Sequence, residues 1–212
     1  LDRVFAEADA RAEQGLDAVD LWDTITRLEV DGARPDRDEK RGIASVLLAG
    51  GRDTVIKVVT GIVWHLVNVP ADRKLLQDDP TMRARAVAEL IRYLTPLAKM
   101  ERIERDEAGT ERGYVLLGYA SANHDPEVWD APERVDIHRE RRPHLSFGAG
   151  RHSCLGMSIA DHETRVFLDV LLEAWPGWEF DGEPDIEWTS EGPDGREALL
   201  ERFNAIPLRV AN

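Results

Sequence analysis

The sequence predicts a mainly helical fold with a minor β component, and three observations support that prediction. Apolar residues recur at helical spacing over most of the chain, one helical pattern runs almost unbroken over residues 36–68, and strand-like runs are few and short. The 212 residues are 42% hydrophobic and 32% charged, which is a globular composition long enough for one large domain or two small ones.

The N-terminal third is predicted to form three helices. Apolar residues at helical spacing run from Leu1 to a stop at Gly15, and a second amphipathic face runs over residues 19–28. The third helix, residues 36–68, opens on acidic residues that suit a helix N-terminus, and it would be roughly 45 Å long. The first half of this helix is apolar on most sides, so we expect it to run through the interior.

The rest of the chain alternates short helices with irregular segments. Helices are expected over residues 71–77 and 80–95, because Pro70 and Pro96 bound them. Residues 114–117 resemble a strand, residues 123–144 read as a long irregular coil, and residues 155–175 are again helical. Two short strands are expected near residues 178–180 and 203–210.

Charge, hydropathy and cysteine content exclude several classes of protein. The formal net charge of −14 argues against a nucleic-acid binder. The longest apolar run, residues 55–69, is interrupted by Lys57 and His65, so no membrane span is expected. Cys154 is the one cysteine, which favours a reducing, cytoplasmic setting. The chain begins with Leu1 and without a basic leader, and we expect it to be a fragment.

The segment around Cys154 carries the sharpest chemical signal. Gly148 and Gly150 permit unusual backbone conformations before Cys154, which lies at the mouth of a long apolar helix. Unpaired N–H groups at a helix N-terminus favour the thiolate, and a thiolate is a metal ligand or a nucleophile. The plainer alternative is a buried structural cysteine beside a glycine turn.

This segment resembles the haem-binding loop of the cytochrome P-450 family, Phe-x-x-Gly-x-x-x-Cys-x-Gly. The matching residues are Phe147, Gly150, Cys154 and Gly156. The resemblance implies that the loop, Gly148 included, binds haem b (iron protoporphyrin IX) and that Cys154 is the axial ligand of the iron. It also implies that His152 reaches a haem propionate, although a solvated loop histidine is the alternative.

A second motif lies inside the predicted long helix. Gly50 and Gly51 each cost about 1 kcal/mol relative to alanine there, which suggests a kink or a close approach. With Asp53 and Thr54 they resemble the family's oxygen-activation motif, which implies a groove for dioxygen and water. The resemblance makes Thr54 and Asp53 the catalytic residues that act on oxygen and relay protons. Small residues in a buried helix are otherwise common.

A third motif is Glu89-Leu90-Ile91-Arg92, whose ends share one helix face. On a protein surface such an ion pair contributes little to stability. It also resembles the family's Glu-x-x-Arg motif, which implies a buried structural triad completed by Arg134. Arg102 follows at the spacing of a second propionate ligand, with Arg105 as a competing candidate.

Two other features remain. His162-Glu163 lacks the following histidine of a zinc helix, so a metalloprotease is excluded. A basic run is either a solvated face or a docking site for an acidic electron donor; its members are Arg139, Arg141, Arg142 and Arg151.

The resemblance spans residues 16–210 and corresponds to the C-terminal half of a bacterial soluble family member. It implies one partial domain, residues 1–212, with the N-terminal half of the fold absent. The expected fold contains the long central helix, the Glu-x-x-Arg helix, the irregular meander, the cysteine loop and its following helix. The implied activity inserts one atom of dioxygen into a small organic substrate. Electrons would come from NAD(P)H through a ferredoxin- or flavodoxin-type donor. The alternative is a truncated, non-catalytic haem-binding remnant or module.

Overall fold

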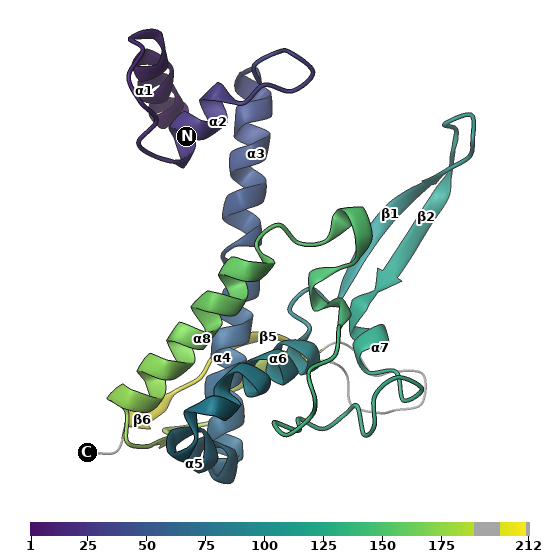
Figure 1. Ribbon diagram of the computed structural model, residues 1–212. Coiled ribbons are helices and arrows are strands. Elements are labelled where there is room, and N and C mark those ends of the chain that lie inside the picture. The colour runs from purple at the N-terminus through teal and green to yellow at the C-terminus, as the bar shows by residue number, and fades with distance from the viewer. Residues whose placement is uncertain (189–199, 211–212) are drawn as a thin grey trace. The chain divides into compact units, whose positions relative to one another are not determined.

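The structure is a computed structural model that describes residues 1–188 and 200–210. It divides into two compact units, the first over residues 1–52 and the second beginning at Asp53. Of the described residues in regular secondary structure, most belong to helices, and the strands are short (Figure 1). The mainly α fold with minor β structure is therefore confirmed. That residues 1–212 form one partial domain stays a prediction.

The first unit contains α1 (Asp2–Glu13), α2 (Leu21–Arg27) and α3 (Arg37–Gly50). Its small core joins Phe5, Ile25 and Ala44, and the Trp22 ring packs edge-on against Phe5 at 5.7 Å. A capping box fixes the start of α3, because the Asp36 carboxylate accepts the Glu39 backbone N–H at 2.9 Å.

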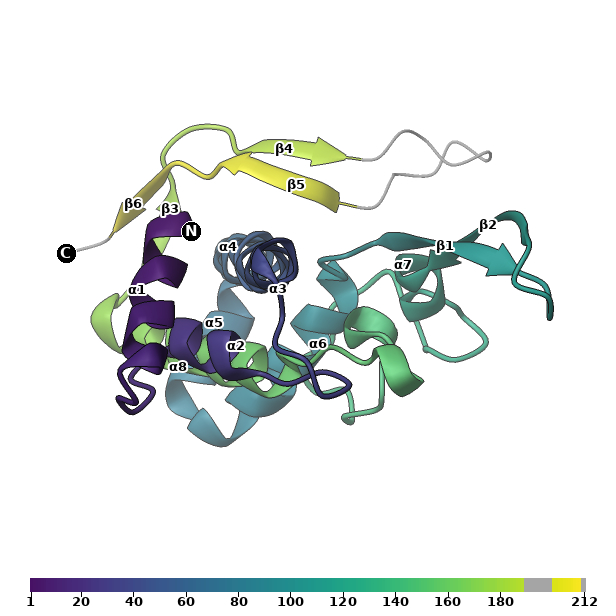
Figure 2. The ribbon, with the colours of Figure 1, turned by 90° about the horizontal axis from the view of Figure 1, so that it is seen from above.

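The second unit is built around α4 (Asp53–Asn68). Helices α5 (Pro70–Asp78), α6 (Arg83–Leu94) and α8 (Met157–Ala174) lie on one side of α4, and the hairpin of β4 and β5 lies on the other (Figure 2). Buried aliphatic side chains fill the helical interface, among them Ile62, Leu90 and Leu168. The close approach of α4 and α6 depends on Gly61, since a Cβ there would lie 2.4 Å from the Leu94 side chain.

Among the described residues of the second unit are three two-stranded antiparallel sheets. Strand β1 (Lys99–Arg105) pairs with β2 (Glu111–Gly118), β3 (Trp178–Phe180) with β6 (Leu208–Val210), and β4 (Asp185–Trp188) with β5 (Leu200–Ala205). Helix α7 (Tyr119–Asn123) follows β2. Short 3₁₀ turns in the described part of the chain are η1 (Pro80–Met82), η2 (Leu145–Phe147) and η3 (Gly150–His152). The long coil expected over residues 123–144 is present from residue 124.

The unbroken helix expected over residues 36–68 is wrong, because α3 ends at Gly50 and α4 begins at Asp53. The break falls on a glycine pair, where the low helix propensity of glycine makes an interruption cheap. The expectation that the first half is interior is also wrong. Helix α3 buries only Lys40 and Ala44, while Val46 and Leu48 are exposed. Within the described residues, no helix is both long and apolar enough to cross a bilayer.

Candidate functional site

The cysteine loop is closed by its own backbone. The Cys154 N–H donates to the Phe147 carbonyl at 2.8 Å, and the Phe147 side chain packs against the helical core. Gly148 has φ +68°, and a Cβ there would lie 3.2 Å from the His152 carbonyl oxygen, so only glycine fits without strain. Gly150 has φ +64°, and its carbonyl accepts both the N–H and the hydroxyl of Ser153. The loop is thus held at both ends.

Cys154 is exposed, so the expected thiolate ligand is accessible and the alternative of a buried structural cysteine is wrong. Its carbonyl accepts the Met157 N–H at 3.3 Å, where α8 begins. A Cβ on Gly156 would lie 3.7 Å from the Cys154 sulfur, so glycine keeps the space beside the sulfur open. Leu155 is 99% exposed and Ile159 is 64% exposed. An accessible sulfur among uncovered apolar side chains fits a large apolar cofactor that binds through sulfur.

Asn123 and Ser146 join the cysteine loop to the end of α6. The Asn123 amide donates to the hydroxyls of Thr95 and Ser146, at 2.9 Å each, and its oxygen accepts the Leu145 N–H at 2.7 Å. The Ser146 hydroxyl donates to the Ile91 carbonyl at 2.9 Å. These bonds fix η2, and therefore Phe147, against the core. The sequence pattern did not single out Ser146, since an isolated serine in coil carries no periodic signal.

Glu89 and Arg92 form the buried pair that the sequence predicted. Two parallel contacts of 2.8 Å join the guanidinium to the carboxylate, and the side chains are 1% and 3% exposed for Arg92 and Glu89. Arg92 also donates to three main-chain carbonyls, that of Asn123 at the end of α7 and those of Pro132 and Arg134 in the irregular coil. Helix α6 is therefore tied directly to the coil that leads to the cysteine loop.

The third member of this cluster is Arg139 instead of the expected Arg134. The Arg139 Nε lies 3.1 Å from the Glu89 Oε2, as an ion pair without hydrogen-bond alignment, and Arg134 contributes only its carbonyl oxygen. The buried Trp129 ring lies 5.2 Å from the Arg92 guanidinium carbon and 6.0 Å from that of Arg139. Neither Arg139 nor Trp129 was assigned to the cluster from sequence.

His144 lies beside this cluster at the entry to η2. Its ring accepts the Ser146 N–H at 3.3 Å and packs against Phe147, with ring centroids 5.8 Å apart. Burial lowers the pKa of His144 to about 4, and the nearby positive charge of Arg92 acts in the same direction. His144 is therefore neutral near pH 7, which suits its role as an acceptor.

The other predicted site residues lie on separate elements. Asp53 and Thr54 occupy the first turn of α4, and Gly50 and Gly51 end the preceding helix. Arg102 is half-buried on β1, where its guanidinium donates to the Glu101 carbonyl at 3.0 Å. His152 is exposed in η3, within the cysteine loop. The structure thus gathers the loop residues into one site, while the ligand roles of Arg102 and His152 stay predictions.

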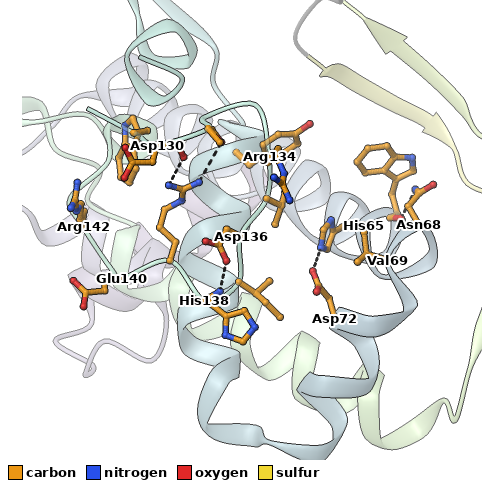
Figure 3. A pocket seen from close by; sticks show the side chains of 17 residues that line it. His65, Asn68, Val69, Asp72, Asp130, Arg134, Asp136, His138, Glu140 and Arg142 are labelled. Carbon is orange, nitrogen blue, oxygen red and sulfur yellow. Dashed lines mark hydrogen bonds and ion pairs between the residues drawn. The ribbon is translucent and has the colours of Figure 1, made fainter. Parts of the chain in front are cut away.

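A cavity of about 850 Å³ lies apart from the cysteine loop, between the ends of α4, α5 and α6 and the coil over residues 129–142 (Figure 3). Of the residues predicted from sequence to form the site, only Arg134 lines it. His65 and Asp72 pair across 2.7 Å on its helical wall. The cavity is therefore not the cysteine site.

Comparison with known proteins identifies a family. The family model that matches is Cytochrome P450, over residues 111–189. Cytochrome P450 monooxygenase PikC of Streptomyces venezuelae is 30% identical over 207 residues, which cover 93% of this chain and 48% of that protein. The 6-deoxyerythronolide B hydroxylase of Saccharopolyspora erythraea is 30% identical, over 90% of this chain and 48% of that protein.

Solved structures show the same relationship. CYP108D1 from Novosphingobium aromaticivorans superposes with a TM-score of 0.80 and 28% identity, over 99% of this chain and 50% of that chain. The cytochrome P450 PksS of Bacillus subtilis 168 gives a TM-score of 0.79 and 27% identity, over 100% of this chain and 54% of that chain. The chain spans about half the length of the relatives it matches.

Proposed function

Because this chain belongs to the cytochrome P450 family, we propose that it forms the haem-binding part of a haem-thiolate monooxygenase. The observation that supports this proposal most is the closed loop that presents the exposed Cys154 sulfur beside uncovered apolar side chains. Cys154 would bind the iron of haem b. His152 and Arg102 would bind its propionates, since both side chains carry N–H groups that can donate hydrogen bonds to a carboxylate.

When bound, the haem iron supplies the redox chemistry that activates dioxygen. The Cys154 thiolate would donate electron density to the iron, which favours O–O cleavage. The positive end of α8, which begins three residues later, would favour the negative charge on that sulfur. The Asn123 and Ser146 hydrogen bonds would hold the loop in place during the reaction.

Asp53 and Thr54 would handle protons on the first turn of α4. A carboxylate can take up and release a proton, and the neighbouring hydroxyl can both donate and accept a hydrogen bond. This pair would therefore pass protons from solvent to the oxygen-binding side.

The proposed reaction inserts one atom of dioxygen into a small organic substrate. Electrons would come from NAD(P)H through a ferredoxin- or flavodoxin-type donor, and the reaction would take place in the cytoplasm. The exposed arginines Arg141, Arg142 and Arg151 would attract an acidic donor, because complementary charge steers encounter. The alternative is a haem-binding chain without turnover.

A coupling experiment tests the proposal. The protein is supplied with haem, NADPH and a surrogate reductase and ferredoxin, and product is measured per NADPH consumed. Thr54→Ala should retain haem and NADPH oxidation but lose most product, while Thr60→Ala, a control on the same helix, should behave as the wild type.

Equal coupling in Thr54→Ala and the wild type would refute the role of Thr54. Bound haem with no product from any form would support the non-catalytic alternative. Failure of the wild-type chain to bind haem would contradict both functions.

A further inference from the structure

Strand β1 has one edge that pairs with no other strand in the ranges that the structure describes. Its other edge pairs with β2, and the two strands form a sheet of their own. The hairpin projects away from the helices of the second unit (Figure 1). An open edge of seven residues is a template on which a further strand can pair.

The open edge presents the backbone of the odd-numbered residues of β1. The Ala98 carbonyl accepts the Ala120 N–H at 2.9 Å and therefore faces the side of β2. Backbone groups alternate in direction along a strand, so those of the odd-numbered residues face away from β2. The Glu101 carbonyl agrees with this alternation, because it accepts a side-chain N–H of Arg102 at 3.0 Å. The register shift of the hairpin leaves out Arg112 of β2, so β1 itself stays regular.

This alternation restricts how two copies of β1 can pair with each other. Hydrogen-bonded residues of an antiparallel pair lie directly opposite one another, so an odd-numbered residue must face an odd-numbered residue. A two-fold pairing centred on Ile103 meets that condition and places Ile103 opposite its own copy. Glu101 then lies opposite Arg105 of the second copy. Arg102 likewise lies opposite Glu104, so every charged contact joins opposite signs.

The neighbouring registers lack this complementarity. A pairing centred on Arg102 would place two copies of that arginine opposite each other, and Lys99 opposite Arg105. A pairing centred on Glu101 or on Glu104 would place two carboxylates opposite each other. Like charges directly opposite each other destabilise a sheet. The charge sequence of β1 therefore selects a single register.

Apolar side chains lie at the centre of that register. Ile103 is 46% exposed, and Tyr114, which lies opposite it on β2, is 74% exposed. Residues that lie opposite each other on neighbouring strands share one face of the sheet. Pairing centred on Ile103 would therefore join the Ile103 and Tyr114 side chains of both copies into one apolar stripe across the sheet.

The charged side chains at the two ends of the contact are accessible. Glu101 and Arg105 are exposed on the same face of β1 as Ile103. Arg105 pairs with Glu111 across the hairpin at 2.5 Å, and its side chain is 52% exposed. A guanidinium has five N–H donors, so Arg105 can bind a second carboxylate. A second copy can thus be accommodated without loss of the ion pair within the hairpin.

We propose that β1 is a self-complementary edge, through which two copies of this chain form a continuous antiparallel sheet centred on Ile103. Main-chain hydrogen bonds would hold the two strands together, and the opposed charges would fix their register. The same residues of each copy would form the contact, as in other two-fold interfaces. The pairing does not depend on haem or on the proposed function.

Complementary charge variants test the proposal in sedimentation velocity of the 212-residue chain over a range of concentrations. Glu101→Arg should weaken association at least tenfold, because two arginines would then oppose each other at both ends of the contact. Arg105→Glu should weaken it as much, because two carboxylates would oppose each other there. An equimolar mixture of the two variants should associate about as strongly as the wild type, because each reversed charge then faces its opposite.

Three further variants complete the experiment. Ile103→Lys should weaken association at least tenfold, because two equal charges would meet on the two-fold axis. Arg202→Glu makes the same change of charge on β5, where Arg202 pairs with Glu187, and should associate as the wild type does. Cys154→Ser should also associate as the wild type does, because the contact contains no disulfide.

Four results would overturn the proposal. They are a wild type that stays monomeric at every concentration, a single edge variant that associates as the wild type does, a mixture that does not recover association, and an equal loss in Arg202→Glu. Loss of association in Cys154→Ser would assign the contact to the cysteine and would also overturn it. Haem binding enters none of these measurements, so failure here is distinguishable from failure of the proposed function.

Discussion

Arg92 is the residue on which the connection between α6 and the cysteine loop depends. Its guanidinium pairs with Glu89 and donates to three main-chain carbonyls, while it is almost fully buried. A buried ion pair adds little stability compared with a well-packed apolar pair. Loss of one partner, however, leaves a buried charge without compensation. The strength of the connection therefore shows only when one member is removed.

Arg92→Met should lower the free energy of unfolding by about 3–5 kcal/mol, because Glu89 would keep a buried charge with only Arg139 opposite it. Arg134→Met should change it by less than about 0.5 kcal/mol, because only the Arg134 main chain takes part in the cluster. Urea denaturation followed by circular dichroism measures both. Equal losses for the two variants would contradict this description of the cluster.

His144 should make stability depend on pH. The unfolded chain binds a proton here near pH 6.5, whereas the native pKa is lowered to about 4. Between these values the unfolded state holds more protons, so the free energy of unfolding falls as pH falls from about 6.5 to about 4, by on the order of 2–3 kcal/mol.

His144→Asn keeps an acceptor for the Ser146 N–H but does not titrate in this range. The free energy of unfolding of His144→Asn minus that of the wild type should therefore increase as pH falls from about 6.5 to about 4. Parallel pH profiles for the two proteins would show that His144 is not the titrating group.

At the residue scale, the sequence predicted local geometry better than long-range pairing. The cysteine loop is a short, contiguous segment with two glycines at positive φ, and hydrogen bonds between nearby residues close it. The arginine that reaches Glu89 lies in a coil that also contains Arg134, Arg141 and Arg142. Coil has no period, so the sequence does not reveal which side chain turns inward.

At the scale of elements, the packing of α4 against α6 depends on one glycine. A Cβ on Gly61 would lie within 2.4–3.1 Å of three Leu94 side-chain atoms, and Leu94 is buried. Gly42 in α3 offers a matched control, since nothing lies within 4 Å of a Cβ there.

Gly61→Ala should lower the free energy of unfolding by about 1–3 kcal/mol through overpacking. Gly42→Ala should raise it by up to about 1 kcal/mol through helix propensity. Chemical denaturation of both variants measures the two effects. Adding Leu94→Ala to Gly61→Ala should cost less than the sum of the single changes, whereas strict additivity would show that the two side chains do not collide.

Element positions followed the hydrophobic period, and the errors have physical causes. The helices over α5, α6 and α8 were predicted because proline and glycine bound clear apolar faces. Hydrophobic periodicity does not distinguish a strained helix that continues through residues 51–52 from a helix that is interrupted there. Strand β4 was missed because four mostly exposed residues carry little pattern.

At the scale of the whole molecule, the hairpin of β1 and β2 leaves apolar side chains uncovered. Tyr114, Val115 and Leu116 are exposed on β2, and the two strands form a sheet of their own with open edges. An open edge with exposed apolar residues favours association with another chain. Helix α3 also exposes apolar side chains, among them Val46 and Leu48.

The 212-residue chain should therefore self-associate as its concentration rises. Leu116→Lys should reduce that association, because residue 116 is 57% exposed and faces Glu101 across the hairpin, so the new charge finds an opposite partner. Leu116→Glu, opposite the same Glu101, should instead loosen the hairpin. Sedimentation velocity over a range of concentrations measures association, and an unchanged profile for Leu116→Lys would exclude this hairpin as the contact.

The most direct test of the central claim is the absorption spectrum of the reduced, haem-loaded protein under carbon monoxide. The account predicts the Soret band of a thiolate-ligated haem for the wild type and its loss in Cys154→Ser, while Ser153→Ala keeps the band. A thiolate-type band that persists in Cys154→Ser, or haem uptake without that band in the wild type, would contradict Cys154 as the iron ligand.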